Sequence, residues 1–120
     1  MKTPQCHSMK LQPEPFKEIR SGNKTIELRL NDEKRQKISV GDIIEFISTE
    51  DAKETLRTEV LHLYHFDSFD ELYKNLPLLK CGYSEENIIT AKPEDMEEYY
   101  PKEKQQQYGV VGIEIRALQK

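Results

Sequence analysis

Tryptophan is absent from this 120-residue sequence, cysteine occurs twice, and glycine and proline occur only five and six times. The low glycine and proline content excludes collagen-like and linker-like chains. No stretch approaches the roughly 20 apolar residues that a membrane-spanning helix needs, so no membrane association is expected. Six tyrosines, four phenylalanines and several aliphatic runs provide enough apolar groups for a small core. We therefore expect one folded domain over residues 1–120.

The two cysteines, Cys6 and Cys81, do not form the C-x-x-C spacing of a metal or redox site. The opening residues, MKTPQCHSMK, contain no apolar segment of the kind that a signal peptide requires. Two cysteines without a secretory segment are typical of a reducing compartment. The sequence thus predicts a cytoplasmic protein with free thiols, no bound metal and no cofactor.

Acidic residues outnumber basic ones by 22 to 18, which gives a net charge of -4. A protein that binds duplex nucleic acid mainly through its phosphates usually carries a basic surplus, so the total charge argues against that mode of binding. The charges are unevenly spread: residues 16–37 hold seven basic and four acidic side chains, and residues 67–104 hold five basic and ten acidic ones. Solvated surface is the simplest interpretation of both stretches, and the first is also compatible with a local basic groove.

Hydrophobic spacing predicts an α+β domain, a small curled sheet with helices packed around it. Phe16 and Ile19 lie on one face of a short helix that begins after two prolines and ends at Gly22. Strands are expected at residues 7–11, 24–30, 43–47, 54–66 and 110–115, and further helices at residues 68–76, 84–89 and 94–100. Residues 102–107 are expected to form only irregular turns.

The clearest strand pattern in the chain is that of residues 24–30. Its three aliphatic side chains point to one face, whereas Glu27 and Arg29 point to the other, because residues two apart share a face. Lys24 stands at the start of the strand, where a glycine turn can direct its ammonium towards the same region. Two cations and one anion in one groove suit a ligand that carries a phosphate or carbonyl group and an exocyclic amine. The alternative is an exposed strand face neutralised by surface ion pairs, each contributing about 0–1 kcal/mol.

These residues form the pattern G-x-K-x-x-E-x-R, which resembles the signature of the ASCH (activating-signal-cointegrator homology) domain family. The four residues of the pattern are Gly22, Lys24, Glu27 and Arg29. A helix with the pattern F-x-x-I-x-S-G precedes it, and a Val-Gly-Asp turn follows at residues 40–42. Tyr-Pro-Lys at residues 100–102 and Tyr-Gly-Val at residues 108–110 are similar to small stand-alone ASCH proteins of bacteria and archaea. The resemblance extends over nearly the whole chain.

The resemblance implies a PUA-like fold, a small β-barrel with helices packed around it. It also implies that the protein binds RNA or a nucleotide-like small ligand in a cleft lined by the signature residues. Lys24 and Arg29 then bind an anionic or carbonyl group of the ligand. Glu27 accepts a hydrogen bond from a polar hydrogen of the ligand or activates that hydrogen. Because the whole chain is acidic, a compact ligand or a few nucleotides of single strand is expected rather than a long duplex.

Some members of the family resemble amidohydrolases that act on N4-acetylcytidine with a lysine, a threonine and a glutamate. Others act on RNA itself, so the resemblance also leaves open a hydrolase that acts on RNA. Lys24 matches that lysine, and Glu27 takes the place of the threonine, although Thr25 lies two residues earlier on the same face. Glu85 or Glu86 is the candidate acid. A hydrolase of this kind would use Glu27 as a general base on water and Lys24 to stabilise the oxyanion.

A third possible function is a protein-interaction domain, in which the acidic residues around 94–98 bind a basic partner. Among the aromatic residues, Tyr64, Tyr73 and Tyr108 are candidates for stacking on a base, and Tyr108 is favoured because it stands beside a glycine at the entry to the last strand. Residues 34–37, Lys-Arg-Gln-Lys, are candidate phosphate contacts.

The stretch 54–66 is expected to be one uninterrupted strand with Val60, His62 and Tyr64 on one face. Leu61, Leu63 and His65 then lie on the other face. His62 and His65 are therefore not expected to share a metal, although either one can act in proton transfer.

Overall fold

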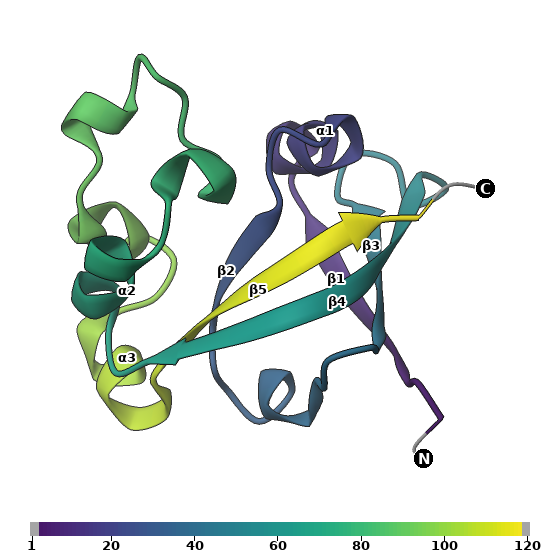
Figure 1. The fold of residues 1–120 in the computed structure, drawn as a ribbon, viewed down its shortest axis with the longest axis horizontal. Helices are drawn as coiled ribbons and strands as arrows, with labels where there is room; N and C mark the ends of the chain where they lie inside the picture. The colour runs from purple at the N-terminus through teal and green to yellow at the C-terminus, as the bar shows by residue number, and fades with distance from the viewer. Residues whose placement is uncertain (1–2, 119–120) are drawn as a thin grey trace.

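The computed structural model describes residues 3–118, in which five strands, three α-helices and several short 3₁₀ helices form an α+β fold (Figure 1). In chain order the elements are β1 (Cys6–Leu11), α1 (Pro13–Ser21), β2 (Ile26–Leu30), η1 (Arg35–Lys37), β3 (Ile43–Ser48), β4 (Thr55–Phe66), α2 (Phe69–Asn75), η2 (Leu78–Cys81), η3 (Ile88–Thr90), η4 (Pro93–Met96), α3 (Lys102–Tyr108) and β5 (Val110–Ala117).

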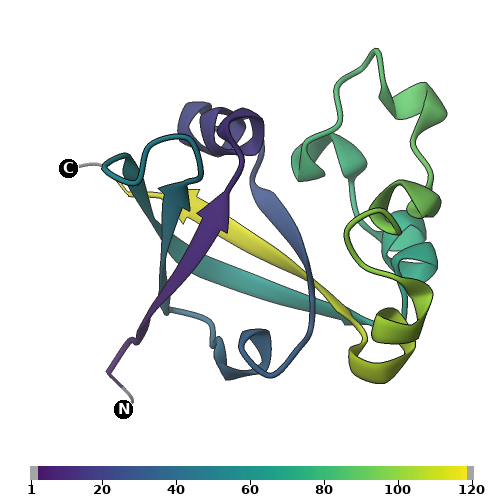
Figure 2. The same ribbon diagram turned by 180° about the vertical axis from the view of Figure 1, so that it is seen from behind.

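The strands form one mixed sheet in the order β1-β3-β4-β5-β2. β1 runs parallel to β3, and the other neighbours are antiparallel. The sheet curves strongly, so that its edge strands β1 and β2 come round towards each other as in an incomplete barrel, and α1 lies over one open end (Figures 1 and 2). The expected α+β fold with a curled sheet is therefore confirmed.

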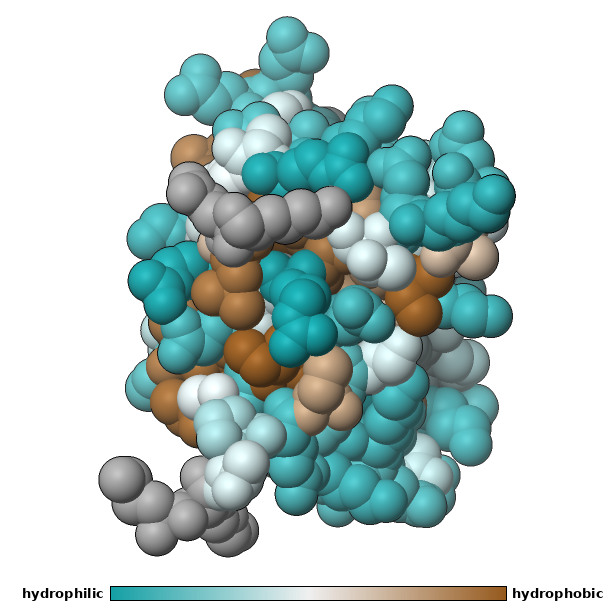
Figure 3. Space-filling view, turned by 90° about the vertical axis from the view of Figure 1, so that its right-hand side faces the viewer, coloured by the Kyte–Doolittle hydropathy of each residue, from teal (hydrophilic) through white to brown (hydrophobic). Residues whose placement is uncertain are grey.

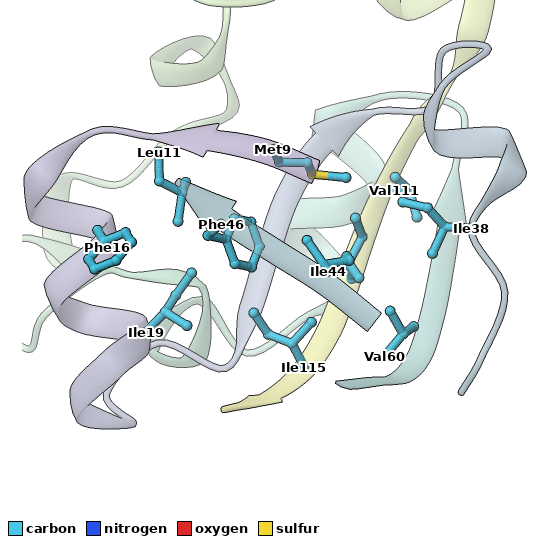
Figure 4. Packing of buried hydrophobic residues seen from close by; sticks show 11 residues of the cluster. Met9, Leu11, Phe16, Ile19, Ile38, Ile44, Phe46, Val60, Val111 and Ile115 are labelled. Atoms are coloured by element: carbon cyan, nitrogen blue, oxygen red, sulfur yellow. The ribbon is translucent and has the colours of Figure 1, made fainter. Parts of the chain in front are cut away.

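One apolar core fills the inside of the curved sheet and continues under α1 (Figure 4). Phe16 and Ile19 each expose only 2% of their surface, because their spacing turns both side chains from the helix towards the sheet. Phe46 of β3 and Val60 of β4 meet them from the strands. Burial of these side chains, at about 25 cal/mol per Å² of apolar surface, stabilises the curved sheet and holds α1 on it.

A second apolar cluster joins β2 and β5 to a layer made by α2, α3 and the 3₁₀ helices η2, η3 and η4, which stands beside β2 (Figures 1 and 2). The aliphatic face of β2 supplies Ile26, Leu28 and Leu30. Phe69 and Leu72 approach from α2. Gly112 of β5 permits the close approach, because a β-carbon there would lie 2.6 Å from Cδ1 of Leu76. β2 is thus packed between the half-barrel and this helical layer.

β4 departs from the expected alternation at Leu61. Val60 and His62 occupy consecutive register positions opposite β5, so Leu61 is the extra residue of a β-bulge and is 40% exposed. Beyond the bulge, Leu63 packs on the same core as Val60, and Tyr64 packs on the second cluster. The expectation that Val60 shares a face with His62 and Tyr64 is wrong, because one inserted residue reverses the alternation.

The region between α2 and β5 contains helices of a different kind from those expected. The helices expected at 84–89 and 94–100 are replaced by the 3₁₀ helices η3 and η4. Ser84 and Asn87 exchange two hydrogen bonds between side chain and backbone, a local turn that competes with an α-helix. Conversely, residues 102–107, expected to be irregular, belong to the regular helix α3. Pro101 precedes that helix, a position where its missing N–H costs nothing.

The surface is mainly hydrophilic where Figure 3 views it, with apolar side chains gathered towards the middle of that face. Among residues 3–118, no helix is both long enough and apolar enough to span a bilayer.

Candidate functional site

The turn between α1 and β2 fixes Lys24 beside the start of the strand. α1 ends at Gly22, whose φ of 87° lies in the left-handed region that favours glycine. The N–H of Gly22 donates to the carbonyl of Ile19 at 3.1 Å, and the N–H of Lys24 donates to the carbonyl of Glu18 at 3.0 Å. The chain is thereby folded back on the end of the helix before β2 begins.

Lys24, Glu27 and Arg29 form a connected set of ion pairs. Nζ of Lys24 lies 2.7 Å from Oε1 of Glu27, and Nε of Arg29 lies 2.7 Å from Oε2 of the same carboxylate. The Glu27 side chain is only 4% exposed, and those of Lys24 and Arg29 are 12% and 13% exposed. The alternative of a solvent-exposed strand face is therefore wrong: the three side chains converge, and they do so largely out of water.

The charges of this set hold one another ionised. Burial raises the pKa of Glu27, but the charges of Lys24 and Arg29 and the hydrogen bonds from both outweigh burial, so the pKa lies below its ordinary value. Burial likewise lowers the pKa of Arg29, and the Glu27 carboxylate outweighs it and leaves the pKa raised. Glu27 is thus ionised, and each of its two carboxylate oxygens forms an ion pair, one with Lys24 and the other with Arg29.

Arg29 also links the two edge strands of the sheet. Its Nη2 donates to the backbone carbonyl of Lys10 in β1 at 2.9 Å, while its Nε donates to Glu27. In the described part of the chain, β1 pairs only with β3 and β2 only with β5. The ion pairs therefore lie where the barrel remains open, and a side chain bridges the gap that a strand ladder would otherwise close.

The 3₁₀ helix η2 and the residue after it pack against Lys24. The N–H of Thr25 donates to the carbonyl of Lys80 at 2.9 Å. Gly82 leaves room for the Lys24 stem, because a β-carbon at this residue would lie 3.3 Å from Cδ of Lys24. Burial raises the pKa of the neighbouring Cys81 thiol to about 11, so this cysteine is a neutral packing group at neutral pH rather than a nucleophile.

Two further cations follow β2 and lie near Arg29. Nη1 of Arg35 is 3.2 Å from Oδ2 of Asp32. Burial and then the positive charges of Arg35 and Arg29 lower the pKa of Lys34, with Asp32 opposing them only in part. We call this group the β2 charge cluster; its members are Lys24, Glu27, Arg29, Asp32, Lys34 and Arg35. The four cations exceed the two carboxylates, which gives the cluster a positive excess in a chain whose net charge is -4.

Tyr100, from the Tyr-Pro-Lys motif, also lies near the cluster. Its ring stacks on that of Phe69 with centroids 5.9 Å apart. Burial raises the Tyr100 pKa, and the charge of Arg29 acts in the opposite direction. Sequence reasoning did not connect Tyr100, Gly82 or the Lys10 carbonyl with β2. All three come from distant parts of the chain, and no local pattern indicates their contact.

Within residues 3–118, the other proposed catalytic residues, Glu85 and Glu86, take no part in the ion pairs of the cluster. Glu85 and Glu86 are exposed in the turn after η2. Within residues 3–118, neither forms an ion pair with Lys24, which is paired to Glu27. Thr25 is partly exposed, and its backbone N–H is bonded to the carbonyl of Lys80.

Tyr108 lies beyond the opposite end of β2 from Lys24. The N–H of Asn31, the residue after β2, donates to the carbonyl of Gly109 at 3.0 Å, so Tyr108 stands next to that end of the strand. Its ring is partly buried against the second apolar cluster, with Nζ of Lys104 5.8 Å from the ring centroid. Tyr108 is therefore separate from the ion-paired set.

The other candidate aromatic residues make contacts within the protein. The rings of His62 and Tyr64 lie 4.4 Å apart, and the Tyr64 hydroxyl donates to Glu114 at 2.8 Å. The hydroxyls of Tyr73 and Tyr83 are hydrogen-bonded at 2.6 Å. These contacts stabilise β4 against β5 and α2 against the segment that follows it.

The family model for the ASCH domain matches residues 9–119 of the chain. No protein of curated function matches the sequence.

Several solved structures share the fold. A hypothetical protein, PH0355, is 33% identical with a TM-score of 0.78, and the match covers 95% of this chain and 100% of that one. Protein PF0455 from Pyrococcus furiosus is 34% identical with a TM-score of 0.70, covering 97% of this chain and all of its own. ASCH from Zymomonas mobilis is 17% identical with a TM-score of 0.66, covering 93% of this chain and 67% of its own. These likenesses confirm the expected PUA-like arrangement, which takes the form of an open half-barrel.

Proposed function

The chain belongs to the ASCH domain family, and on that basis we propose that it binds RNA, or a nucleotide-like ligand, at the β2 charge cluster. The observation that carries the proposal is the convergence of Lys24, Glu27 and Arg29 where the barrel is open, with Lys34 and Arg35 alongside. In an acidic chain, a local excess of positive charge is the feature that attracts phosphate.

The cations of the cluster retain donors for a ligand. The Arg29 guanidinium has five N–H groups, and its contacts with Glu27 and Lys10 use only Nε and Nη2. The Lys24 ammonium has three donors and contacts one carboxylate oxygen. A phosphate or base carbonyl at the cluster would accept from the remaining donors. Glu27 holds the two cations in position and acts as a positioning residue.

The favoured ligand is a short single strand. The cluster is compact, and the acidic remainder of the chain repels a long duplex. Recognition of single-stranded RNA depends on stacking and base-edge contacts in addition to phosphate contacts, and a small folded domain can supply both.

The test is the binding of a fluorescently labelled single-stranded RNA of about 8 nucleotides, followed by anisotropy as the salt concentration is raised. The variant Lys34→Gln/Arg35→Gln should bind more weakly, and the slope of log K against log salt should fall by about 0.7 for each phosphate contact removed. The matched control, Lys53→Gln/Arg57→Gln, removes two cations near the β3–β4 turn and should bind like the parent. Equal loss in both variants, or no RNA binding by the parent, would contradict the proposal.

The hydrolase alternative has less geometric support. Both carboxylate oxygens of Glu27 contact cations, and its pKa is held below the ordinary value, so it is a weak base towards water. Glu85 and Glu86 are exposed outside the cluster. We therefore expect no turnover when the protein is incubated with N4-acetylcytidine and absorbance is followed. Turnover that disappears in Lys24→Ala would favour the hydrolase instead.

A further inference from the structure

A hollow with a volume of about 660 Å³ lies at the end of β2 remote from Lys24. It is formed where β2 and β4 end and β5 begins, with the C-terminal part of α3 along one side. Its size falls within the range of roughly 300–1,000 Å³ that is typical of small-molecule sites. We call it the Tyr108 hollow; the residues that matter here are Asn31, His65, Phe66, Gln106, Gln107 and Tyr108.

The lining of the hollow combines aromatic rings with amide side chains, and Asp67 and Ser68 complete one side of it. His65, Phe66 and Tyr108 provide ring systems, and Asn31 and Gln107 provide amides, each of which can both donate and accept hydrogen bonds. This combination differs from the β2 charge cluster, in which charge predominates. Rings beside amides are complementary to a flat heterocycle whose edge carries donors and acceptors, as a nucleobase does.

Asn31 has unused hydrogen-bonding capacity at this hollow. Its backbone is fixed, because the N–H donates to Gly109 at 3.0 Å and the carbonyl accepts from Nε2 of Gln36 at 2.9 Å. Its Oδ1 is buried and has no hydrogen-bond partner among residues 3–118. A buried polar atom without a partner costs about 1–3 kcal/mol. A rotation of the amide towards a bound group with a donor would therefore be favourable.

The conformation of Gly109 sets the position of Tyr108. Gly109 has φ 74° and ψ -175°, a region that residues with a side chain rarely adopt. A β-carbon there would lie 3.0 Å from the Phe66 carbonyl oxygen. Gly109 therefore lies close to Phe66, the last residue of β4. This contact places Tyr108, at the end of α3, beside the end of β4. The hollow is thus built on ordered backbone from three strands and a helix.

We propose that the Tyr108 hollow binds one nucleobase of the RNA, stacked against both Tyr108 and His65, with its edge contacting the amides of Asn31 and Gln107. The inference rests on the proposed function, since it assigns a second part of the ligand to a second part of the same surface. Asn31 follows Arg29 by two residues, about 7 Å along a strand. A single RNA strand can therefore place a phosphate at Arg29 and a base in the hollow.

The test compares normal and abasic single-stranded RNA of the same length, measured by anisotropy. The parent protein should bind the normal strand more tightly than the abasic one. His65→Ala/Asn31→Ala should bind the normal strand roughly 5- to 150-fold more weakly, as expected for the loss of a stacking contact. The same variant should bind the abasic strand as the parent does. Tyr108→Leu, which preserves apolar packing, should give the same pattern, and the control Tyr99→Leu, at a tyrosine that is 63% exposed elsewhere, should have no effect.

The outcomes separate this inference from the proposed function. If the parent binds normal and abasic RNA equally, the base site is overturned and the phosphate contacts of the β2 charge cluster stand. If neither RNA binds, the proposed function fails. In a second measurement, ¹⁵N-labelled protein is titrated with each of the four ribonucleosides and with ribose 5-phosphate. Shifts of the Asn31 and Gln107 side-chain amides by a nucleoside but not by the sugar phosphate support the base site, and absence of those shifts contradicts it.

Discussion

At the scale of single residues, Glu27 is the carboxylate on which the arrangement of the cluster depends. It is buried, and both of its neighbours in the ion-paired set are cations. Removing one partner of a buried ion pair generally costs about 3–5 kcal/mol, because the remaining charge is left uncompensated. Here a neutral residue at position 27 leaves the buried cations of Lys24 and Arg29 without the carboxylate that they share.

The variant Glu27→Gln is therefore expected to lower the free energy of unfolding at neutral pH by about 3 kcal/mol or more. The pKa of Glu27 is lower in the folded than in the unfolded chain, so its stabilising contribution is fully present above the unfolded value of about 4.5 and is lost as the pH falls below it. Urea unfolding of parent and variant, measured between about pH 7 and pH 3, should show the difference shrinking on acidification.

The control for this measurement is Glu98→Gln, which neutralises an exposed carboxylate. It should change stability by no more than about 0.5 kcal/mol at any of these pH values. A Glu27→Gln variant as stable as the Glu98→Gln protein would mean that the buried ion pairs are absent in solution.

At the scale of elements, the contact of α2 with β5 depends on a missing side chain. A β-carbon at Gly112 would lie 2.6 Å from Leu76 and 3.3 Å from Ile26, so the helical layer and β2 approach the sheet through this glycine. Gly112→Ala is expected to destabilise the protein by about 1–3 kcal/mol through overpacking. Thermal or urea unfolding measures the change.

The matched double variant isolates the cause. Leu76→Ala removes the methyl group that obstructs the new β-carbon, so Gly112→Ala should cost less in that background than in the parent. If the changes in the free energy of unfolding of the two single variants simply add in the double variant, Gly112 is needed for a reason other than its contact with Leu76.

Elements with strong local signals were predictable from the sequence. α1 has paired apolar residues between prolines and Gly22, and β2 alternates over five residues, so local chemistry and tertiary structure agree. The bulge at Leu61 was not predictable, because aliphatic and aromatic residues follow one another there and either alternation fits. The 3₁₀ helices of residues 82–101 likewise depend on contacts with α2, such as that of Tyr83 with Tyr73.

The candidate site was predictable only in part. Residues two apart on a strand share a face, so the proximity of Glu27 and Arg29 follows from spacing. Their burial does not follow from spacing. It arises from Lys10 of β1 and from the segment around η2, both of which are distant from β2 in the sequence. The Tyr108 hollow is similarly formed by Asn31, His65 and Tyr108, which no local pattern connects.

At the scale of the whole molecule, stability is unevenly distributed. β5 lies between β4 and β2 and contributes to both apolar clusters, whereas residues 82–101 contain only short 3₁₀ helices and turns. Amides of β5 should therefore exchange hydrogen only through global unfolding, and those of residues 82–101 should exchange faster through local opening. Hydrogen exchange followed by mass spectrometry measures both, and equal protection of the two segments would contradict this view of the fold.

The charge distribution of the whole molecule bears on where RNA binds. An acidic chain that carries the positively charged β2 charge cluster should direct a single strand to that cluster. Raising the salt concentration should weaken binding in proportion to the number of phosphate contacts.

The most direct measurement is a titration of ¹⁵N-labelled protein with a short single-stranded RNA, followed by amide chemical shifts. We predict that the largest shifts lie at Lys24, Arg29, Lys34 and Arg35, with little change at Lys53 and Arg57 near the β3–β4 turn. Shifts confined to that turn or to the acidic residues 94–98, or no shifts at all, would contradict RNA binding at the β2 charge cluster.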